Sequence, residues 1–182
     1  MELTANKIRA RDMAYTGAMV ALTAICSWIS IPTAIPFTLQ TMAVFLAVGL
    51  LGGKRGTIAV TAYVLLGAVG APVFAGFSSG PAVLLGQTGG YILGFIGSAL
   101  LMWGLEKLWG TGLKALGVSM FLGLLVCYAF GTAWFMFLYT KNTGPVGLWT
   151  VLGWCVIPYI IPDLVKIAVA LGLTARLRRH VK

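Results

Sequence analysis

Charged residues are scarce in this sequence of 182 residues: they make up 9% of the chain, whereas hydrophobic residues make up 59%. In soluble globular domains, charged residues account for about 25% of the chain. Together with a mean hydropathy of +0.96, this composition excludes an ordinary soluble domain. A membrane-spanning helix takes about 20 residues, so six helices and their connections fill the chain. We therefore expect a single membrane domain over residues 1–182.

Histidine is nearly absent, because the chain has only His180, which stands in the basic C-terminal segment. This excludes Ser-His-Asp and Cys-His catalysis within the membrane, and it excludes histidine-based metal sites. Cys26, Cys127 and Cys155 each lie in an apolar run without a second Cys or His at metal-ligand spacing. We interpret them as buried packing residues and expect neither a metal nor another cofactor.

A nucleotide-binding loop is missing as well. The segment that begins at Gly49 reads GLLGGKR, which is one residue short of the GxxxxGK[ST] spacing. It also lacks the Ser or Thr that holds magnesium in such loops. We therefore expect that this chain does not hydrolyse ATP itself.

Six apolar segments follow one another along the chain. The core of a bilayer offers no water to backbone N–H and C=O groups, so spanning segments form helices or alternating barrel strands, and these segments do not alternate. The second segment is short enough to be tilted or partly re-entrant. The sequence predicts an all-α integral membrane protein, multi-pass in the cell membrane, with six transmembrane helices. We expect these helices at roughly residues 13–31, 38–52, 56–73, 87–105, 115–140 and 151–175.

Basic residues fall almost entirely on one side of the predicted membrane protein. We therefore attribute the net charge of +9 to orientation in the membrane and expect no nucleic acid as a partner. The opposite side has Lys141 alone, and Lys166 lies within the last apolar segment. Because cytoplasmic connections are enriched in Lys and Arg, we expect both termini in the cytoplasm. The residues on the cytoplasmic side are Lys7, Arg9, Arg11, Lys54, Arg55, Lys107, Lys114, Arg176, Arg178, Arg179 and Lys182.

Asp163 and Lys166 are ionisable residues within the last apolar segment, in PYIIPDLVKIA. An ionisable group at membrane depth costs about 3 kcal/mol or more, so it faces a protein interior or a water-filled cavity. Three residues apart, the two share a helix face, and Pro158 and Pro162 predict that the helix breaks or begins there. Two interpretations remain open. The residues form either an ion pair that eases insertion or a site with an acceptor for N–H groups and a cation for an anionic or carbonyl oxygen.

The connection from Gly70 to Tyr91, GAPVFAGFSSGPAVLLGQTGGY, is rich in glycine. This connection and the uncharged IPTAIPFTLQ are too apolar for solvated linkers, so we expect them to cover a site at the outer face. Gln87, Thr88 and Tyr91 stand at the entrance of the fourth helix, where they either cap it or contact a ligand. A ladder of small residues in this helix predicts close packing against a neighbour, and it consists of Gly86, Gly90, Gly94 and Ser98.

Two further surfaces allow two interpretations each. Phe130 and Trp134 lie on one stripe of the fifth helix, either as part of an interfacial aromatic belt or as a wall on which a flat ligand stacks. Ala14 and Ala18 belong to a stripe of small residues on the first helix, which another helix can approach closely. That other helix belongs either to the same chain or to another subunit.

Four motifs stand in order along the chain: PFTLQT, GAPVFAGFSSG followed by LLGQTGGYILGF, FGTAWF and PYIIPDLVKI. Together they resemble the BioY family, the biotin-binding membrane subunits of energy-coupling-factor (ECF) vitamin transporters. The similarity covers nearly the whole chain. Gln87 departs from the family's pattern, which more often has proline before TGGY.

The resemblance implies the fold of an ECF S component, a subunit that captures biotin from outside for ATP-driven import and is not an enzyme. It implies as partners an EcfT-type membrane coupling subunit, two ATPase subunits and the lipid bilayer. It also implies that the stripe with Ala14 and Ala18 contacts the coupling subunit. The candidate substrate-binding residues are Asp163, Lys166, Gln87, Tyr91, Ser79, Phe74 and Trp134.

Other functions remain open at this point. The chain is alternatively an S component for another vitamin, or a small-solute carrier that works without ATPase partners. An intramembrane enzyme with Asp163 as acid or base is disfavoured, because this carboxylate has no intramembrane His or second acid to work with and the cysteines are interpreted as packing residues.

Overall fold

The computed structural model describes the backbone of residues 2–33 and 35–181 and the side chains of residues 10–33 and 35–179. The described chain is mainly helical, with a short hairpin between the first two helices. In chain order the elements are α1 (Glu2–Trp28), β1 (Ser30–Ile31), β2 (Phe37–Thr38), α2 (Gln40–Leu51), α3 (Gly53–Ala68), η1 (Ala75–Phe77), α4 (Pro81–Leu84), α5 (Gly89–Trp109), α6 (Leu113–Asn142), α7 (Leu148–Cys155), η2 (Ile157–Tyr159) and α8 (Ile160–Val181).

Each predicted apolar segment corresponds to helical structure, which confirms the all-α prediction. Within the described residues, three helical segments are long and apolar enough to cross a membrane: α5, α6 and the segment Leu148–Arg179 that contains α7 and most of α8. α2 is apolar but has only 12 residues. The chain therefore has the long apolar helices of a multi-pass membrane protein.

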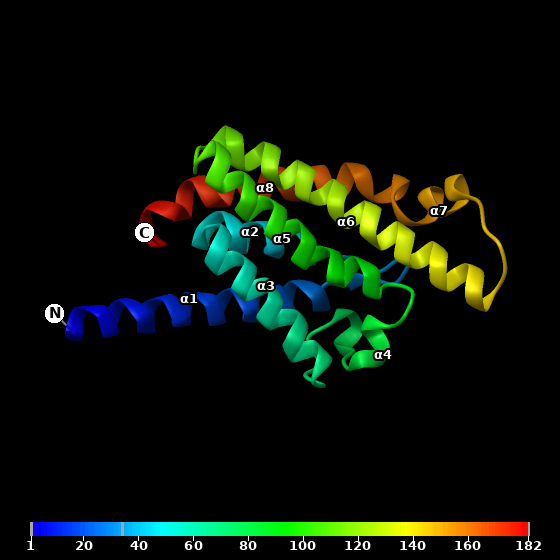
Figure 1. The fold of residues 1–182 in the computed structure, drawn as a ribbon, viewed down its shortest axis with the longest axis horizontal. Helices are drawn as coiled ribbons and strands as arrows, with labels where there is room; N and C mark the ends of the chain where they lie inside the picture. Colours follow the sequence, from blue (N-terminus) through cyan, green and yellow to red (C-terminus); the bar gives the residue numbers. More distant parts are fainter. Residues whose placement is uncertain (1, 34, 182) are drawn as a thin grey trace.

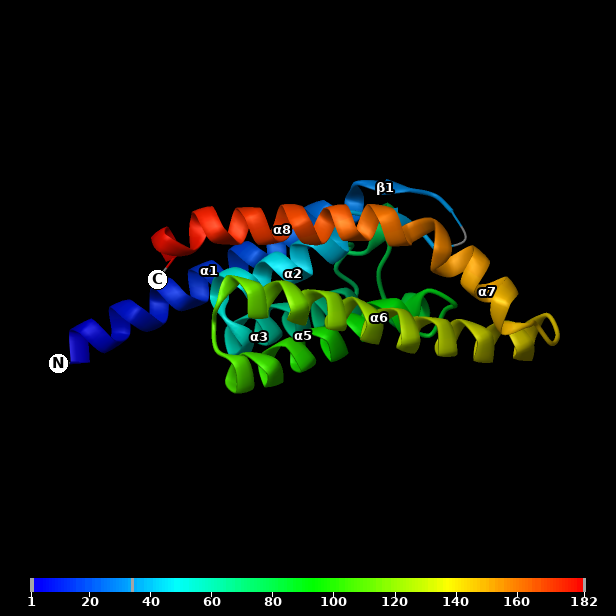
Figure 2. The same cartoon turned by 90° about the horizontal axis from the view of Figure 1, so that it is seen from above.

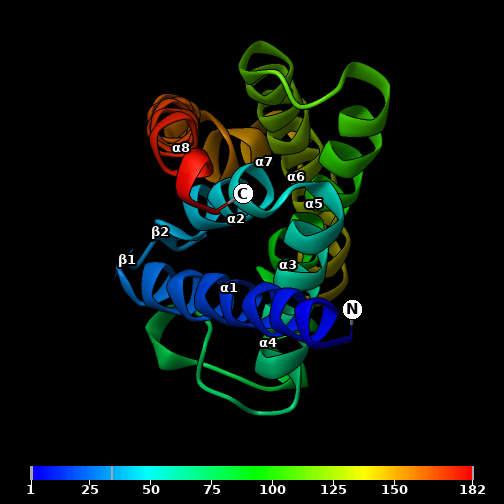
Figure 3. The same cartoon turned by 90° about the vertical axis from the view of Figure 1, so that its left-hand side faces the viewer.

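α2 lies in the middle of the bundle, which Figure 3 shows from one end. It packs against α1, α3, α5 and α8. All of its residues from Ala43 to Leu50 are buried. A helix that is apolar all round is stable only when other elements cover every side of it. The short second apolar segment is thus a helix enclosed by its neighbours, and its tilt in a membrane stays a prediction.

α5 and α6 pack side by side along the predicted ladder of small residues. A Cβ atom at Gly90 would overlap the Trp134 side chain. Further along the two helices, Ser98 Oγ donates a hydrogen bond to the carbonyl oxygen of Gly123 at 2.5 Å. The prediction that this ladder packs closely against a neighbouring helix is therefore confirmed for Gly90, Gly94 and Ser98, whereas Gly86 lies in the turn before α5.

The last apolar segment breaks just before its ionisable residues. α7 ends at Cys155, a 3-10 turn spans Ile157–Tyr159, and α8 begins at Ile160. Pro158 lies in this turn, and proline has no N–H to continue a helix. The predicted break is confirmed, and it places Asp163 in the first turn of α8, where the helix dipole favours a carboxylate.

Both termini lie at one end of the bundle, together with the α2–α3 and α5–α6 connections (Figures 1 and 2). Polar contacts join the helices at this end. Arg55 pairs with Asp12 at 2.5 Å, and Glu106 accepts a hydrogen bond from the backbone N–H of Gly53 at the start of α3. The opposite end carries the β1–β2 hairpin, α4 and the α6–α7 connection (Figures 1 and 2).

We expect Gly90→Ala to lower the free energy of unfolding by about 1–3 kcal/mol, because the added methyl group has no room beside Trp134. Thermal unfolding of the purified protein in detergent measures the change. Gly104 lies on the same helix, and apart from the adjoining residues of that helix nothing lies within 4 Å of where its Cβ would lie, so Gly104→Ala is the matched control. That control should unfold at the wild-type temperature or slightly above it. Equal losses in the two variants would contradict the close contact between α5 and α6.

Candidate substrate-binding site

A cavity of about 120 Å³ lies among the β1–β2 hairpin, the loop before α4, the first turns of α5, the middle of α6 and the start of α8. A single water molecule needs only about 10–15 Å³, so this cavity has room for a small organic ligand. Its walls are mostly apolar. The polar side chains that line it are Thr38, Gln40, Thr41, Ser78, Thr88, Tyr91, Tyr128, Tyr159, Asp163 and Lys166.

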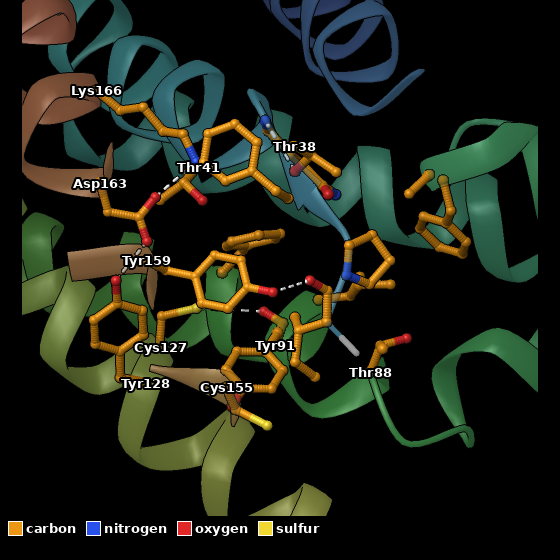
Figure 4. A pocket seen from close by; sticks show the side chains of 18 of the residues that line it. Thr38, Thr41, Thr88, Tyr91, Cys127, Tyr128, Cys155, Tyr159, Asp163 and Lys166 are labelled. Carbon is orange, nitrogen blue, oxygen red and sulfur yellow. Dashed lines mark hydrogen bonds and ion pairs between the residues drawn. The ribbon is translucent and has the colours of Figure 1, made fainter. Parts of the chain in front are cut away.

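Asp163 and Lys166 form a buried ion pair in the wall of the cavity. Lys166 Nζ donates to Asp163 Oδ1 at 2.7 Å, and each side chain is 6% exposed. Tyr128 on α6 donates its hydroxyl proton to the other carboxylate oxygen, Oδ2, at 2.5 Å. Figure 4 shows Asp163 between Lys166 and Tyr128. The prediction that Asp163 and Lys166 share a helix face is confirmed, and a third residue from another helix completes the group.

The hairpin covers this ion pair with an aromatic ring. Lys166 Nζ lies 4.1 Å from the centroid of the Phe37 ring, which is the geometry of a cation–π interaction. Phe37 also stacks on Tyr159, with ring centroids 6.3 Å apart. The Tyr159 hydroxyl reaches the hairpin loop, where it lies 2.5 Å from the Ile35 carbonyl oxygen and 2.7 Å from Thr33 Oγ1. These contacts close the cavity on the side of the hairpin.

The loop between α3 and α4 closes a second side. Its Phe74 side chain is buried and packs edge-on against Tyr63, with ring centroids 5.7 Å apart. The ring presses on Gly67 of α3, where any side chain would overlap it. Trp28 Nε1 on α1 donates a hydrogen bond to the carbonyl oxygen of Pro72 at 2.9 Å. The glycine-rich connection thus lies over the cavity, as expected from its apolar sequence.

The chemistry of this cavity suits a small amphipathic molecule. Apolar residues such as Ile92, Phe95 and Leu124 form its walls, and a few polar groups fix the orientation of a ligand, which is the usual composition of a small-molecule site. Both carboxylate oxygens of Asp163 already accept hydrogen bonds from protein groups. In the part of the chain that the structure describes, no cluster of three His, Cys, Asp or Glu residues is arranged to hold a metal.

Of the seven substrate-binding candidates from the sequence, the structure brings Asp163, Lys166, Tyr91 and Phe74 together around the cavity. Tyr91 stands in the first turn of α5, and its hydroxyl lies 3.3 Å from Thr132 Oγ1. These residues come from α5, α8 and the loop before α4, so the fold joins segments that are far apart in the sequence.

The other three candidates, Gln87, Ser79 and Trp134, do not line the cavity, in contrast to the sequence-based expectation that all seven lie around one site. Gln87 is exposed on the turn before α5, and Ser78 rather than Ser79 faces the cavity. Trp134 Nε1 donates a hydrogen bond to the Gly86 carbonyl oxygen at 3.0 Å, so this side chain anchors the turn before α5.

The predicted stacking wall on the fifth helix is likewise not part of the cavity. Phe130 and Trp134 stack on each other, with ring centroids 6.3 Å apart, and Phe130 is exposed. The side chains of α6 that face the cavity are Leu124, Cys127 and Tyr128.

Ala14 and Ala18 on α1 are exposed, together with Ala10 and Gly17. Packing of this stripe against another helix of the same chain was the alternative interpretation. It is wrong for the described residues, because a stripe covered by a neighbouring helix would be buried. The stripe lies on the part of α1 toward the end of the bundle that carries both termini (Figure 1).

The residues of the site that sequence reasoning missed include Phe37, Gln40, Tyr128 and Tyr159. Three of them stand in the motifs PFTLQT and PYIIPDLVKI, so the motifs marked their segments without indicating which side chains face inward. Tyr128 stands outside all four motifs, and nothing in the sequence indicates that its side chain faces inward. Cys26, Cys127 and Cys155 are buried and free, as predicted, and two of them, Cys127 and Cys155, also line the cavity.

The fold is similar to that of a protein of known structure. The crystal structure of the S-component for biotin from an ECF-type ABC transporter matches with a TM-score of 0.84 and 29% sequence identity, over 96% of this chain and 94% of that chain. The two proteins therefore share the fold and a recognisable sequence similarity over nearly their whole length. The prediction of an ECF S-component fold is therefore confirmed.

Sequence comparison agrees with the structure. The chain is 38% identical over 177 residues to the biotin transporter BioY of Thermotoga maritima, which covers 93% of this chain and 96% of that protein. It is 39% identical over 172 residues to a probable biotin transporter BioY of Pyrococcus horikoshii, which covers 94% of this chain and 98% of that protein. The profile of the BioY family matches residues 2–182, and this chain therefore belongs to the BioY family.

Proposed function

We propose that this chain is the biotin-binding S component of an ECF-type transporter, which captures biotin from outside for import driven by separate ATPase subunits. The relatives named above are a biotin transporter and a probable biotin transporter, and the similar crystal structure is that of an S-component for biotin. The observation that carries the proposal on this chain is the buried Asp163–Lys166 pair in the wall of an otherwise apolar cavity.

Biotin has a ureido ring with two N–H donors and a carbonyl oxygen, an apolar sulfur ring, and an aliphatic tail that ends in a carboxylate. The cavity offers the complementary groups. The Asp163 carboxylate accepts from N–H groups, and Lys166 provides a cation for the ureido oxygen or the carboxylate. The aromatic rings of Phe37, Tyr91 and Tyr159 provide apolar surface for the sulfur ring and the tail. A largely preformed site of this kind binds without much ordering of the protein.

In the membrane, we propose six spanning segments, formed by α1, α2, α3, α5, α6 and α7 with α8, with both termini in the cytoplasm. The shared position of the termini at one end of the bundle supports this arrangement (Figure 1). The basic residues that stand at the same end include Arg11, Lys54, Arg55 and Lys107. Lys182 and the side chains of Lys7 and Arg9 lie outside the described residues. The cavity then opens toward the outside, because the hairpin and the α3–α4 loop lie at the opposite end.

The coupling partner is an EcfT-type subunit that docks on the stripe of α1 with Ala14 and Ala18. Small exposed side chains let another helix approach to backbone distance, which favours helix association in a bilayer. Because the stripe lies toward the cytoplasmic end and the cavity at the other, one chain binds substrate and partner at different places.

The experiment that tests the proposed site is biotin binding to Asp163→Asn and Lys166→Ala. Each variant should raise the Kd for biotin at least tenfold, or about 1.4 kcal/mol, because each change breaks the buried pair that faces the ligand. Equilibrium binding of labelled biotin to the purified protein in detergent measures this loss.

Asp12→Asn and Lys107→Ala are the matched controls, since both residues lie at the end with the termini and away from the cavity. Both should bind biotin as the wild type does. Near-wild-type affinity in both Asp163→Asn and Lys166→Ala would remove these residues from the site. Competition by other vitamins in the same assay separates biotin capture from an S component for a different substrate.

The topology is tested with single introduced cysteines at two lysines of opposite ends, Lys54→Cys and Lys141→Cys. A membrane-impermeant thiol reagent added to intact cells should label Lys141→Cys and not Lys54→Cys, because the proposal places Lys54 in the cytoplasm. Cys26, Cys127 and Cys155 are buried, so their background labelling should be low. The reverse pattern would overturn the orientation.

Ala14→Trp should abolish ATP-driven uptake and co-purification with the coupling subunit, because a bulky side chain keeps a partner helix from the stripe. Biotin binding to the isolated subunit should stay within about threefold of wild type, a difference below about 1 kcal/mol. Ala133→Trp on α6 replaces another exposed alanine and serves as the control that keeps transport. Normal assembly and transport in Ala14→Trp would show that the stripe faces lipid rather than a partner.

A further inference from the structure

Gln40, the first residue of α2, lines the cavity and is only 5% exposed. Its carboxamide carries two N–H donors and one carbonyl oxygen, so its role toward a ligand depends on which end of the amide faces the cavity. Three neighbouring hydrogen bonds determine that orientation.

Tyr63 on α3 is fully buried, and its hydroxyl lies 2.8 Å from the carbonyl oxygen of Val73 in the loop before α4. A backbone carbonyl oxygen only accepts, so the single proton of the Tyr63 hydroxyl lies in this bond. Ser27 Oγ on α1 lies 2.5 Å from the same carbonyl oxygen and 2.7 Å from the carbonyl oxygen of Ala24, and both of these oxygens only accept, so the serine donates its proton to them. The Tyr63 oxygen is therefore left to accept hydrogen bonds.

The amide of Gln40 lies 2.7 Å from the Tyr63 oxygen, and the group that faces Tyr63 must be the donor, Nε2. With Oε1 in that place, two oxygen atoms would meet without a proton between them. The orientation of the amide thus follows from the Val73 carbonyl oxygen through Tyr63, and it turns Gln40 Oε1 away from Tyr63.

Gln40 Oε1 has no hydrogen-bond donor among the described residues. Among the described residues, Arg178 Nε is the fully buried side-chain nitrogen or oxygen that lacks a hydrogen-bond partner. Gln40 Oε1 lacks a partner too but is not fully buried, so it borders open space. The open space beside this buried residue is the cavity. An acceptor held in a fixed orientation at the wall of an apolar cavity favours a ligand with an N–H at that place, and it disfavours one without it.

We propose that Gln40 Oε1 accepts a hydrogen bond from one N–H of a cyclic urea and is a specificity-determining residue of the site. This inference rests on the proposed function, since biotin supplies the urea. Gln40, Tyr63 and Val73 form a relay that connects the ligand to the loop covering the cavity, with Ser27 bonded to the same carbonyl oxygen. An analogue in which the contacted nitrogen carries a methyl group lacks the proton that Gln40 accepts.

The test uses Gln40→Met, which keeps the length of the side chain and removes the acceptor, with three probes: biotin and two biotins methylated at one or the other ureido nitrogen. We expect the Kd for biotin to rise at least tenfold. For one of the two methylated biotins, wild type and Gln40→Met should differ by less than twofold, because the wild type cannot make the contact with that ligand either. Equal losses for all three probes would show a purely structural role and overturn the inference.

Gln87→Met is the matched control, because Gln87 is the other glutamine of the chain and is exposed outside the cavity. It should bind all three probes as the wild type does. Biotin binding within twofold of wild type in Gln40→Met would also overturn the inference. A wild-type protein that fails to bind biotin would instead refute the proposed function, so the two failures are distinguishable.

Tyr63→Phe tests the relay without changing Gln40. Loss of the hydroxyl lets the amide turn, so the Kd for biotin should rise severalfold, by less than in Gln40→Met. Thermal unfolding without ligand establishes that both variants are folded. A Tyr63→Phe variant that unfolds cooperatively and binds biotin as the wild type does would contradict the proposed orientation of the amide.

Discussion

The buried ion pair between Asp163 and Lys166 is the interaction on which the rest of the site depends. Neither charge is stable alone at membrane depth, and removing one partner of a buried pair costs about 3–5 kcal/mol. Several parts of the fold meet at this pair. Pro158 lies in the turn that separates α7 from α8, so that Asp163 stands in the first turn of α8. Tyr128 on α6 donates to the second carboxylate oxygen of Asp163. Phe37 on the hairpin covers the ammonium group of Lys166.

Around this pair, two connections and the central helix α2 form the cavity. The Tyr159 hydroxyl, from the turn before α8, donates a hydrogen bond to the hairpin, and the Tyr63 hydroxyl, from α3, donates one to the α3–α4 loop. Each of the two connections that cover the cavity is thus bonded to an element beside the site. α2 is buried along most of its length and carries Gln40 at its first residue. The end with the termini has no part in the cavity and exposes the stripe with Ala14 and Ala18. The cavity and the exposed stripe are thereby separated along the bundle.

The helices of this fold can be predicted from the sequence because long apolar runs have few alternatives in a bilayer. The break at Pro158 and the pairing of Asp163 with Lys166 follow from local rules of helix geometry. The inward-facing side chains are less predictable. Helical spacing tells which residues share a face but not which face meets the cavity, and for that reason Trp134 was assigned to the site whereas Tyr128 was not. The role of Gln40 depends on hydrogen bonds between three elements, and no local pattern contains them.

The most direct test of the account is the stoichiometry and selectivity of biotin binding to the purified wild-type chain, measured by calorimetric titration in detergent. The account predicts one saturable site per chain for biotin, with no heat from riboflavin or thiamine at the same concentrations. A chain that binds no biotin, or that binds the three vitamins equally well, would contradict the claim that this cavity is built for biotin.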